Sequence, residues 1–241
     1  MGKTLALLYG ILSYLVFFGT FLYAFWFLWS MDAGRPASPL TRALLINAGL
    51  LALFAVQHSV MARQWFKNAW TKIVPPPMER STYVLLASLL LLALIRFWQP
   101  LPTVIWEVEN TPGRFLLRAL FVLGWLLVLV STFLIDHFEL FGLKQVWSYW
   151  RGRSFQPPAF KMPGLYRFVR HPLYLGWIIA FWSTPLMTLD HLFFAVITTA
   201  YILLAVQFEE RDLARFHGEA YKAYRSRVSM LVPWPSKRKA P

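Results

Sequence analysis

The sequence contains no cysteine and few histidines, and this limits the metal chemistry open to the protein. Without cysteine among its 241 residues, the chain can form no disulfide bond and no cysteine-ligated zinc or iron–sulfur site. Integral-membrane di-iron enzymes use clustered histidine pairs, whereas the five histidines here are isolated in the sequence. We therefore expect no metal site.

Glycine-rich nucleotide-binding motifs are also missing. The chain has neither the phosphate loop of the P-loop NTPases nor the Gly-x-Ser-x-Gly turn of the α/β-hydrolases, and no strand pattern of a dinucleotide-binding fold. No DNA- or RNA-binding motif accompanies the net charge of +13. These absences exclude several classes of soluble enzyme, and we expect no nucleic-acid partner.

Long apolar runs dominate the chain instead. Apolar residues make up 58% of it and aromatic residues 18%, in runs near or above the ~18 to 20 residues that cross a bilayer. A last apolar stretch, residues 172–207, is divided by turn-forming residues near 184–191. The sequence thus predicts an all-α, polytopic integral membrane helical bundle that forms a single domain over residues 1–241. Its six expected spans, with five as the alternative count, are residues 5–29, 40–61, 81–98, 115–135, 172–188 and 191–207.

The basic residues orient these spans. With six spans, most of the 24 lysine and arginine residues lie on the side of the two termini, and the positive-inside rule makes that side cytoplasmic. The net charge is then explained by topology and by attraction to anionic lipids. We expect amphipathic surface segments over residues 62–80 and 208–227, the second as a C-terminal helix that lies along the membrane.

Polar side chains gather at the predicted cytoplasmic ends of the spans. Gln57 and His58 end the second span, His137 follows the fourth, and Glu209 and Glu210 end the sixth. An ionisable residue just inside a span is a functional candidate by default, because burying it is costly. The alternatives are that His58 only bonds a neighbouring helix and that the two glutamates are a solvated helix start.

A basic, aromatic loop leads directly into the fifth apolar segment. Proline is tolerated in the first turn of a helix, so Pro172 places His171 near the N-cap position. Arg167 and Arg170 precede it, and the free N–H groups of that turn, together with these cations, suit a carboxylate or another anion. The alternative is a membrane helix whose basic flanks only snorkel to the surface.

Two motifs together resemble a known family. Residues 164–176 (Gly-Leu-Tyr-Arg-Phe-Val-Arg-His-Pro-Leu-Tyr-Leu-Gly), followed by Glu209 and Glu210, resemble the membrane methyltransferase superfamily that includes isoprenylcysteine carboxyl methyltransferases and phospholipid N-methyltransferases. The resemblance covers most of residues 40–233 and is closest to the bacterial branch that methylates methanethiol. The resemblance is carried by residues 57–59, 131–147, 208–213 and 220–225 together with the Arg-His-Pro stretch, but only residues 57–59 and the exit of the fourth span point to that branch. It implies a protein of the bacterial inner membrane that uses S-adenosyl-L-methionine.

The resemblance places the cofactor at the basic loop and the paired glutamates. From charge and shape, the carboxylate of S-adenosyl-L-methionine would meet Arg170 and His171. Its ammonium or ribose would meet Glu209 or Glu210, and its adenine would stack among nearby aromatic side chains. The expected cofactor-binding residues are Gln145, Tyr166, Arg167, Arg170, His171, Pro172, Tyr174, Leu175, Gly176, Glu209 and Glu210.

The reaction implied is methylation of a small thiol, which would convert methanethiol to dimethyl sulfide at a cytoplasm-facing site. A thiol is mostly protonated at neutral pH, so a proton acceptor or a cationic neighbour is needed. His58 is the expected acceptor beside Gln57, with Arg80 and His137 as further catalytic candidates. The partners would be a small apolar thiol and membrane lipids. The alternatives are methylation of an isoprenylcysteine carboxylate or a lipid headgroup, or a non-enzymatic membrane accessory protein of related fold.

Overall fold

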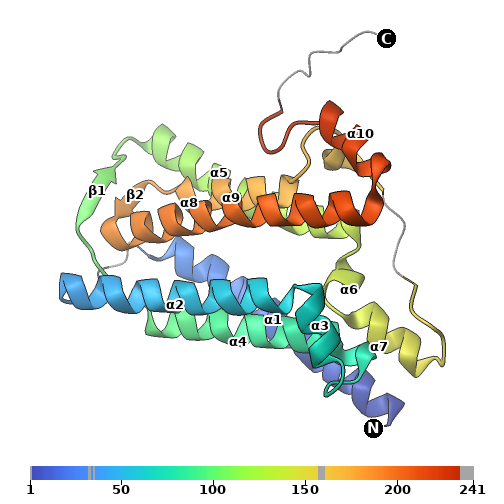
Figure 1. The fold of residues 1–241 in the computed structure, drawn as a ribbon. Coiled ribbons are helices and arrows are strands. Elements are labelled where there is room, and N and C mark those ends of the chain that lie inside the picture. Colours follow the sequence, from blue (N-terminus) through green and yellow to red (C-terminus); the bar gives the residue numbers. More distant parts are fainter. Residues whose placement is uncertain (1, 32–33, 35, 157–160, 234–241) are drawn as a thin grey trace. The chain divides into compact units, whose positions relative to one another are not determined.

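The computed structural model describes residues 2–31, 34, 36–156 and 161–233, and these residues are mostly helical (Figure 1). Two short strands, β1 (Val104–Glu107) and β2 (Leu186–Thr188), pair with each other. The helices are α1 (Lys3–Trp29), α2 (Leu40–Met61), α3 (Gln64–Trp70), α4 (Glu79–Phe97), α5 (Thr111–Ile135), α6 (His137–Leu140), α7 (Leu143–Trp150), α8 (Pro172–Trp182), α9 (Leu189–His217) and α10 (Glu219–Arg227), with 3₁₀ turns η1 (Pro76–Met78) and η2 (Gly164–Arg167). The predicted all-α class is confirmed.

Among the described residues, five helices are long and apolar enough to cross a membrane. They are α1, α2, α4 with the turn before it, α5 and α9. The first four overlap the first four predicted spans, and α9 contains the sixth, so the class of a polytopic membrane bundle is confirmed. The fifth predicted span, residues 172–188, contributes the shorter apolar helix α8, which has 11 residues. The count of six spans stays a prediction.

The chain forms two compact units rather than one uniform bundle. The first is drawn from Met1–Ile105, Asp136–Pro157 and Met187–His191, and the second from Trp106–Ile135, Pro158–Leu186 and Leu192–Pro241. Both units therefore contain segments that are distant in the sequence. The single domain expected over residues 1–241 stays a prediction, and the two units are described separately below.

In the first unit, α1 packs against α4 and α7, and α2 packs against α4. Gly10 lets α1 approach α7 closely, because a Cβ at this position would lie 2.5 Å from Val146. A buried cluster that includes Met61 and Tyr83 joins the end of α2 to the start of α4. This packing holds in place the helix ends that carry the predicted catalytic residues.

In the second unit, α5 packs along α8 through two glycines. A Cβ at Gly124 would lie 2.7 Å from the carbonyl oxygen of Gly176, and a Cβ at Gly176 would lie 2.7 Å from the carbonyl oxygen of Gly124. Such small residues let two membrane helices approach until their backbones touch. The α5–α8 contact therefore depends on the absence of side chains at these two positions.

Non-helical flanks extend the path of α8 along α5. Before α8, a Cβ at Gly164 would lie 3.2 Å from Leu134, in the last turn of α5. After α8, the carbonyl of Pro185 accepts a hydrogen bond of 2.8 Å from the N–H of Val108, just before α5 begins. The segment thus runs from one end of α5 to the other, although only its central 11 residues form α8. This path supports a sixth crossing.

The last long helix extends further than the sequence indicates. α9 continues through His217, and α10 begins at Glu219 after a turn at Gly218, whose φ of +56° favours glycine. The helix expected over residues 208–227 is therefore divided. Its first half prolongs α9, and its second half forms the separate helix α10.

Candidate functional site

The second unit contains a buried ionic cluster centred on Glu210 of α9. Its Oε1 lies 2.6 Å from Nε of Arg170 and 3.1 Å from Nε2 of His171. Its Oε2 lies 3.1 Å from Nε of Arg225. Glu210 is only 3% exposed, and an ionised carboxylate at that depth requires charge compensation of this kind. Three elements, the loop before α8, α9 and α10, therefore meet at one carboxylate.

The chain after α10 holds Arg170 and His171 of the loop in position. Val169 forms an isolated parallel bridge with Ser229, whose carbonyl accepts a hydrogen bond of 2.8 Å from the N–H of Arg170. The N–H of His171 donates to the carbonyl of Met230 at 3.1 Å. α8 begins immediately after His171, which occupies its N-cap position as predicted. The backbone thus orients both side chains before any ligand binds.

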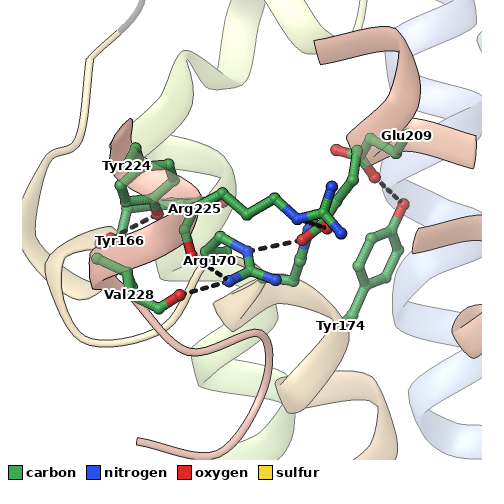
Figure 2. A network of polar contacts seen from close by, with 9 residues as sticks. Tyr166, Arg170, Tyr174, Glu209, Tyr224, Arg225 and Val228 are labelled. Carbon is green, nitrogen blue, oxygen red and sulfur yellow. Dashed lines mark hydrogen bonds and ion pairs between the residues drawn. The ribbon is translucent and has the colours of Figure 1, made fainter. Parts of the chain in front are cut away.

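Aromatic residues border this cluster (Figure 2). The hydroxyl of Tyr174 donates to Oε2 of Glu209 at 2.7 Å, and the hydroxyl of Tyr224 donates to the carbonyl of Tyr166 at 2.6 Å. Burial raises the pKa of Tyr224 to about 12 and also raises the pKa of Tyr166, so both phenols are neutral at physiological pH. The second unit therefore combines cations, acids and neutral aromatic rings.

The predicted cofactor-binding residues fall into several groups. The structure brings together Tyr166, Arg170, His171, Tyr174, Glu209 and Glu210. Pro172, Leu175 and Gly176 lie on α8, where Gly176 packs against α5. Arg167 does not join the Glu210 cluster, because its Nε donates to the carbonyl of Met162 at 3.4 Å. Gln145 belongs to the first unit, where its amide donates to the carbonyl of Glu139 at 3.1 Å.

Arg225 is the member of the Glu210 cluster that sequence reasoning missed. It lies on α10, a helix with a buried face that includes Tyr221 and Tyr224. The sequence showed the amphipathic pattern of this helix but not the partner of its buried face. The signal available in the sequence was a basic residue that directly follows Tyr224 and lies four residues after Tyr221.

In the first unit, His58 is paired with Tyr83. The hydroxyl of Tyr83 lies 3.0 Å from both ring nitrogens of His58 and 3.4 Å from the carbonyl oxygen of the same residue. If the phenol donates to that carbonyl, it accepts from one ring N–H and leaves the other ring nitrogen as a proton acceptor. Tyr83 was missed from the sequence, although it lies one turn after Arg80 at the same end of the third span.

Two further catalytic candidates lie close to this pair. Arg80 donates from Nε to the carbonyl of Leu140 at 2.7 Å, and its guanidinium carbon lies 5.1 Å from the ring centroid of Tyr83. Gln57 donates from Nε2 to Sδ of Met61 at 3.0 Å. Its Oε1 is buried and has no hydrogen-bond partner within the described part of the chain. A buried hydrogen-bond acceptor is costly to leave unpaired, so this oxygen is suited to a ligand that donates a hydrogen bond.

His137, the remaining catalytic candidate, is held by aromatic packing. Its Nε2 lies 2.8 Å from the hydroxyl of Tyr14, and its ring meets those of Tyr14 and Phe141 edge-on at 5.7 and 4.9 Å. The residue is 3% exposed, and burial lowers its pKa. These contacts hold the His137 ring in place, and its catalytic role stays a prediction.

Sequence comparisons identify relatives of the whole chain. Residues 63–228 match the family described as "Protein of unknown function (DUF1295)". The chain is 53% identical over 240 residues to the methanethiol S-methyltransferase of Mycobacterium tuberculosis, with 98% of each chain covered. It is 50% identical over 244 residues to the protein of the same name from Crocosphaera subtropica, with 99% of this chain and 95% of the relative covered.

A more distant relative is nurim of Xenopus laevis, which is 34% identical over 194 residues, with 74% of this chain and 65% of nurim covered. No solved structure matches the chain. The alignments with the two bacterial relatives cover 98% and 99% of this chain. The chain therefore belongs to the DUF1295 family and, within it, to the family of the methanethiol S-methyltransferases.

Proposed function

We propose that the protein is a membrane enzyme that methylates methanethiol to dimethyl sulfide, with S-adenosyl-L-methionine as the methyl donor. The observation that carries this proposal is the nearly full-length identity, 53% and 50%, with relatives named methanethiol S-methyltransferase. The polar clusters of the two units supply side chains for two separate tasks. One cluster suits the charged cofactor, and the other suits a proton transfer.

The donor set of the second unit fits S-adenosyl-L-methionine. Arg170 and His171 are suited to its carboxylate, and the neutral rings of Tyr166 and Tyr174 are suited to its adenine. Glu210 is already paired with three cationic or ring nitrogens, whereas Glu209 accepts a hydrogen bond from the hydroxyl of Tyr174. Glu209 is therefore the acid that we assign to the ammonium or ribose. When bound, the cofactor would supply an electrophilic methyl group on a positively charged sulfur, which a thiolate could accept with neutral S-adenosyl-L-homocysteine as the leaving group.

The first unit supplies the proton acceptor for the thiol. We assign this role to the unprotonated ring nitrogen of His58, so that the S–H bond breaks and its proton moves to the imidazole. Before this proton transfer, the unpaired Oε1 of Gln57 accepts a hydrogen bond from the S–H group and orients the thiol. The guanidinium of Arg80 favours the thiolate through its positive charge. His137 has no role in this scheme.

We further propose six spans in the bacterial inner membrane, with both termini in the cytoplasm. The excess of lysine and arginine on the side of the termini supports this orientation. Both polar clusters would then face the cytoplasm. A reporter enzyme fused after Pro241 should be active in the cytoplasm, and a periplasmic signal would contradict the orientation.

Headspace gas chromatography tests the activity. The purified full chain in lipid should release dimethyl sulfide from methanethiol only when S-adenosyl-L-methionine is present, and isothermal titration should show that the cofactor binds. Cofactor binding without dimethyl sulfide would redirect the assignment to an isoprenylcysteine or lipid headgroup substrate. No binding and no product would instead favour the non-enzymatic alternative.

A further inference from the structure

The second unit carries an open groove of about 670 Å³ between α10 and the segment that leads to η2. Three cations line it, Lys161, Arg167 and Arg227, and its lining contains no acidic residue. Apart from Tyr224, the rest of the lining is apolar or small. The groove thus combines a positively charged wall with an apolar floor.

The positive charge of this groove is not neutralised by carboxylates. Lys161, Arg167 and Arg227 are all exposed, and within the described residues none of the three forms an ion pair with an acid. Arg167 only donates to the carbonyl of Met162, at 3.4 Å. An anionic group in the groove would therefore meet three cations at once, without displacing a partner from any of them.

The groove lies at the level where the helices of this unit end. Pro163, which lines the groove, directly precedes Gly164, where a Cβ would lie 3.2 Å from Leu134 in the last turn of α5. Large apolar side chains nearby are exposed, with Met162 at 43%, Phe168 at 67% and Phe216 at 81%. Basic residues interleaved with exposed apolar ones at the end of membrane helices are typical of a surface in contact with lipid headgroups.

We infer that this groove binds an anionic phospholipid, with the phosphate of its headgroup against the three cations and the start of its acyl chains against the apolar floor. Charge complementarity and position favour a lipid over a soluble anion. This inference concerns binding alone and holds whether or not the protein methylates methanethiol. The cofactor is the rival occupant, because Val228 both lines the groove and accepts a hydrogen bond from Arg170 through its carbonyl.

Native mass spectrometry of the full chain in detergent, titrated with phosphatidylglycerol, tests the inference. Lys161→Gln combined with Arg227→Gln should lower the affinity for phosphatidylglycerol by about 10- to 30-fold, because each basic residue near a membrane surface contributes about fivefold. Phosphatidylcholine binding should not change. The matched control is Arg215→Gln combined with Lys222→Gln, which removes the same charge from α9 and α10 outside the groove and should change the affinity less than twofold.

Three results would overturn the inference. An equal loss in both double variants would mean that the lipid is attracted by the net charge and not held in the groove. Competition between S-adenosyl-L-methionine and phosphatidylglycerol for one site would assign the groove to the cofactor. Soluble sn-glycerol 1-phosphate binding as tightly as the lipid would assign it to a soluble anion. Lys161→Arg combined with Arg227→Lys keeps the charge and should retain lipid binding, which separates charge from folding.

Discussion

The guanidinium Nε of Arg170 lies 2.6 Å from Oε1 of Glu210, and the two side chains are 10% and 3% exposed. This pair joins the loop before α8 to α9 across 40 residues of sequence. A buried pair of this kind adds little net stability relative to apolar residues of the same volume, but loss of one partner leaves an uncompensated charge. The pair therefore fixes the geometry of the candidate cofactor site.

Glu210→Gln should lower the free energy of unfolding by about 3 kcal/mol, since it leaves the buried guanidinium of Arg170 without its carboxylate. The same change should weaken S-adenosyl-L-methionine binding by about 1 to 3 kcal/mol. Thermal unfolding in detergent and isothermal titration measure the two effects. Glu219→Gln is the matched control, because Glu219 is 87% exposed and pairs with a neighbouring lysine on the surface. Equal unfolding temperatures for the two variants would contradict the buried pair.

Gly176→Ala should destabilise the second unit by about 1 to 3 kcal/mol, because the added Cβ would overlap the backbone of α5. Gly49→Ala on α2 is the control, since a Cβ there meets nothing within 4 Å. In a helix, that control change should be neutral or slightly stabilising. Thermal unfolding of both variants separates the two cases. If Gly176→Ala unfolds like the parent protein and only loses cofactor affinity, the original assignment of Gly176 to the cofactor stands.

Gly176 was expected to bind the cofactor, and in the structure it packs against α5. This residue illustrates what the sequence can and cannot predict. Apolar runs of sufficient length predicted the long helices, because crossing a bilayer requires about 20 apolar residues whatever their neighbours are. The close contact between Gly124 and Gly176 depends instead on how two distant helices approach. Nothing in the local pattern of α8 distinguishes a glycine that packs from one that contacts a ligand.

For the polar residues too, the sequence predicted which segments act together but not which side chains pair. The sequence predicted that the basic loop and the paired glutamates would act together, since both carry charges at the same expected membrane surface. It assigned Arg170, and either Glu209 or Glu210, to the ligand, and it did not predict that Arg170 and Glu210 also pair with each other. Similarly, the contact of His58 with Tyr83 arises from the packing of α2 on α4, which local sequence patterns do not encode.

His137 should make stability depend on pH. Burial lowers its pKa below the value of about 6.5 in unfolded chains, so the unfolded state binds more protons as the pH falls. Its contribution to stability is therefore complete above about pH 6.5 and is lost as the pH falls toward the folded pKa. Thermal unfolding between about pH 7.5 and 5.5 should show a decline that His137→Gln reduces. Parallel declines in both proteins would assign the pH dependence to other groups.

Tyr83→Phe tests whether the tyrosine positions His58. The change keeps the ring in its cluster with Met61 but removes the hydroxyl that lies 3.0 Å from the imidazole. Turnover should fall by about 10- to 100-fold, as is usual when the orienting partner of a functional histidine is lost, while cofactor affinity stays the same. Tyr9→Phe is the control, because it removes a hydroxyl bonded to Thr82 at 3.0 Å. Equal turnover in the two variants would leave Tyr83 a packing role only.

His58→Ala separates proton transfer from cofactor binding. If His58 accepts the thiol proton, the dissociation constant for S-adenosyl-L-methionine should stay nearly the same while turnover falls by about 10² to 10⁴, the range of a positioned general base. A higher pH should restore part of the lost rate, because more of the thiol is then ionised without help.

A histidine that only packs against Tyr83 would behave differently under His58→Ala. The variant would express poorly or unfold at a lower temperature, and the surviving protein would turn over normally at every pH. A stable variant that binds the cofactor and methylates methanethiol at the parent rate at neutral pH would exclude His58 as the acceptor. Arg80 would then be the next residue to change, because its guanidinium lies 5.1 Å from the ring of Tyr83 and a cation can lower the pKa of a thiol without accepting its proton.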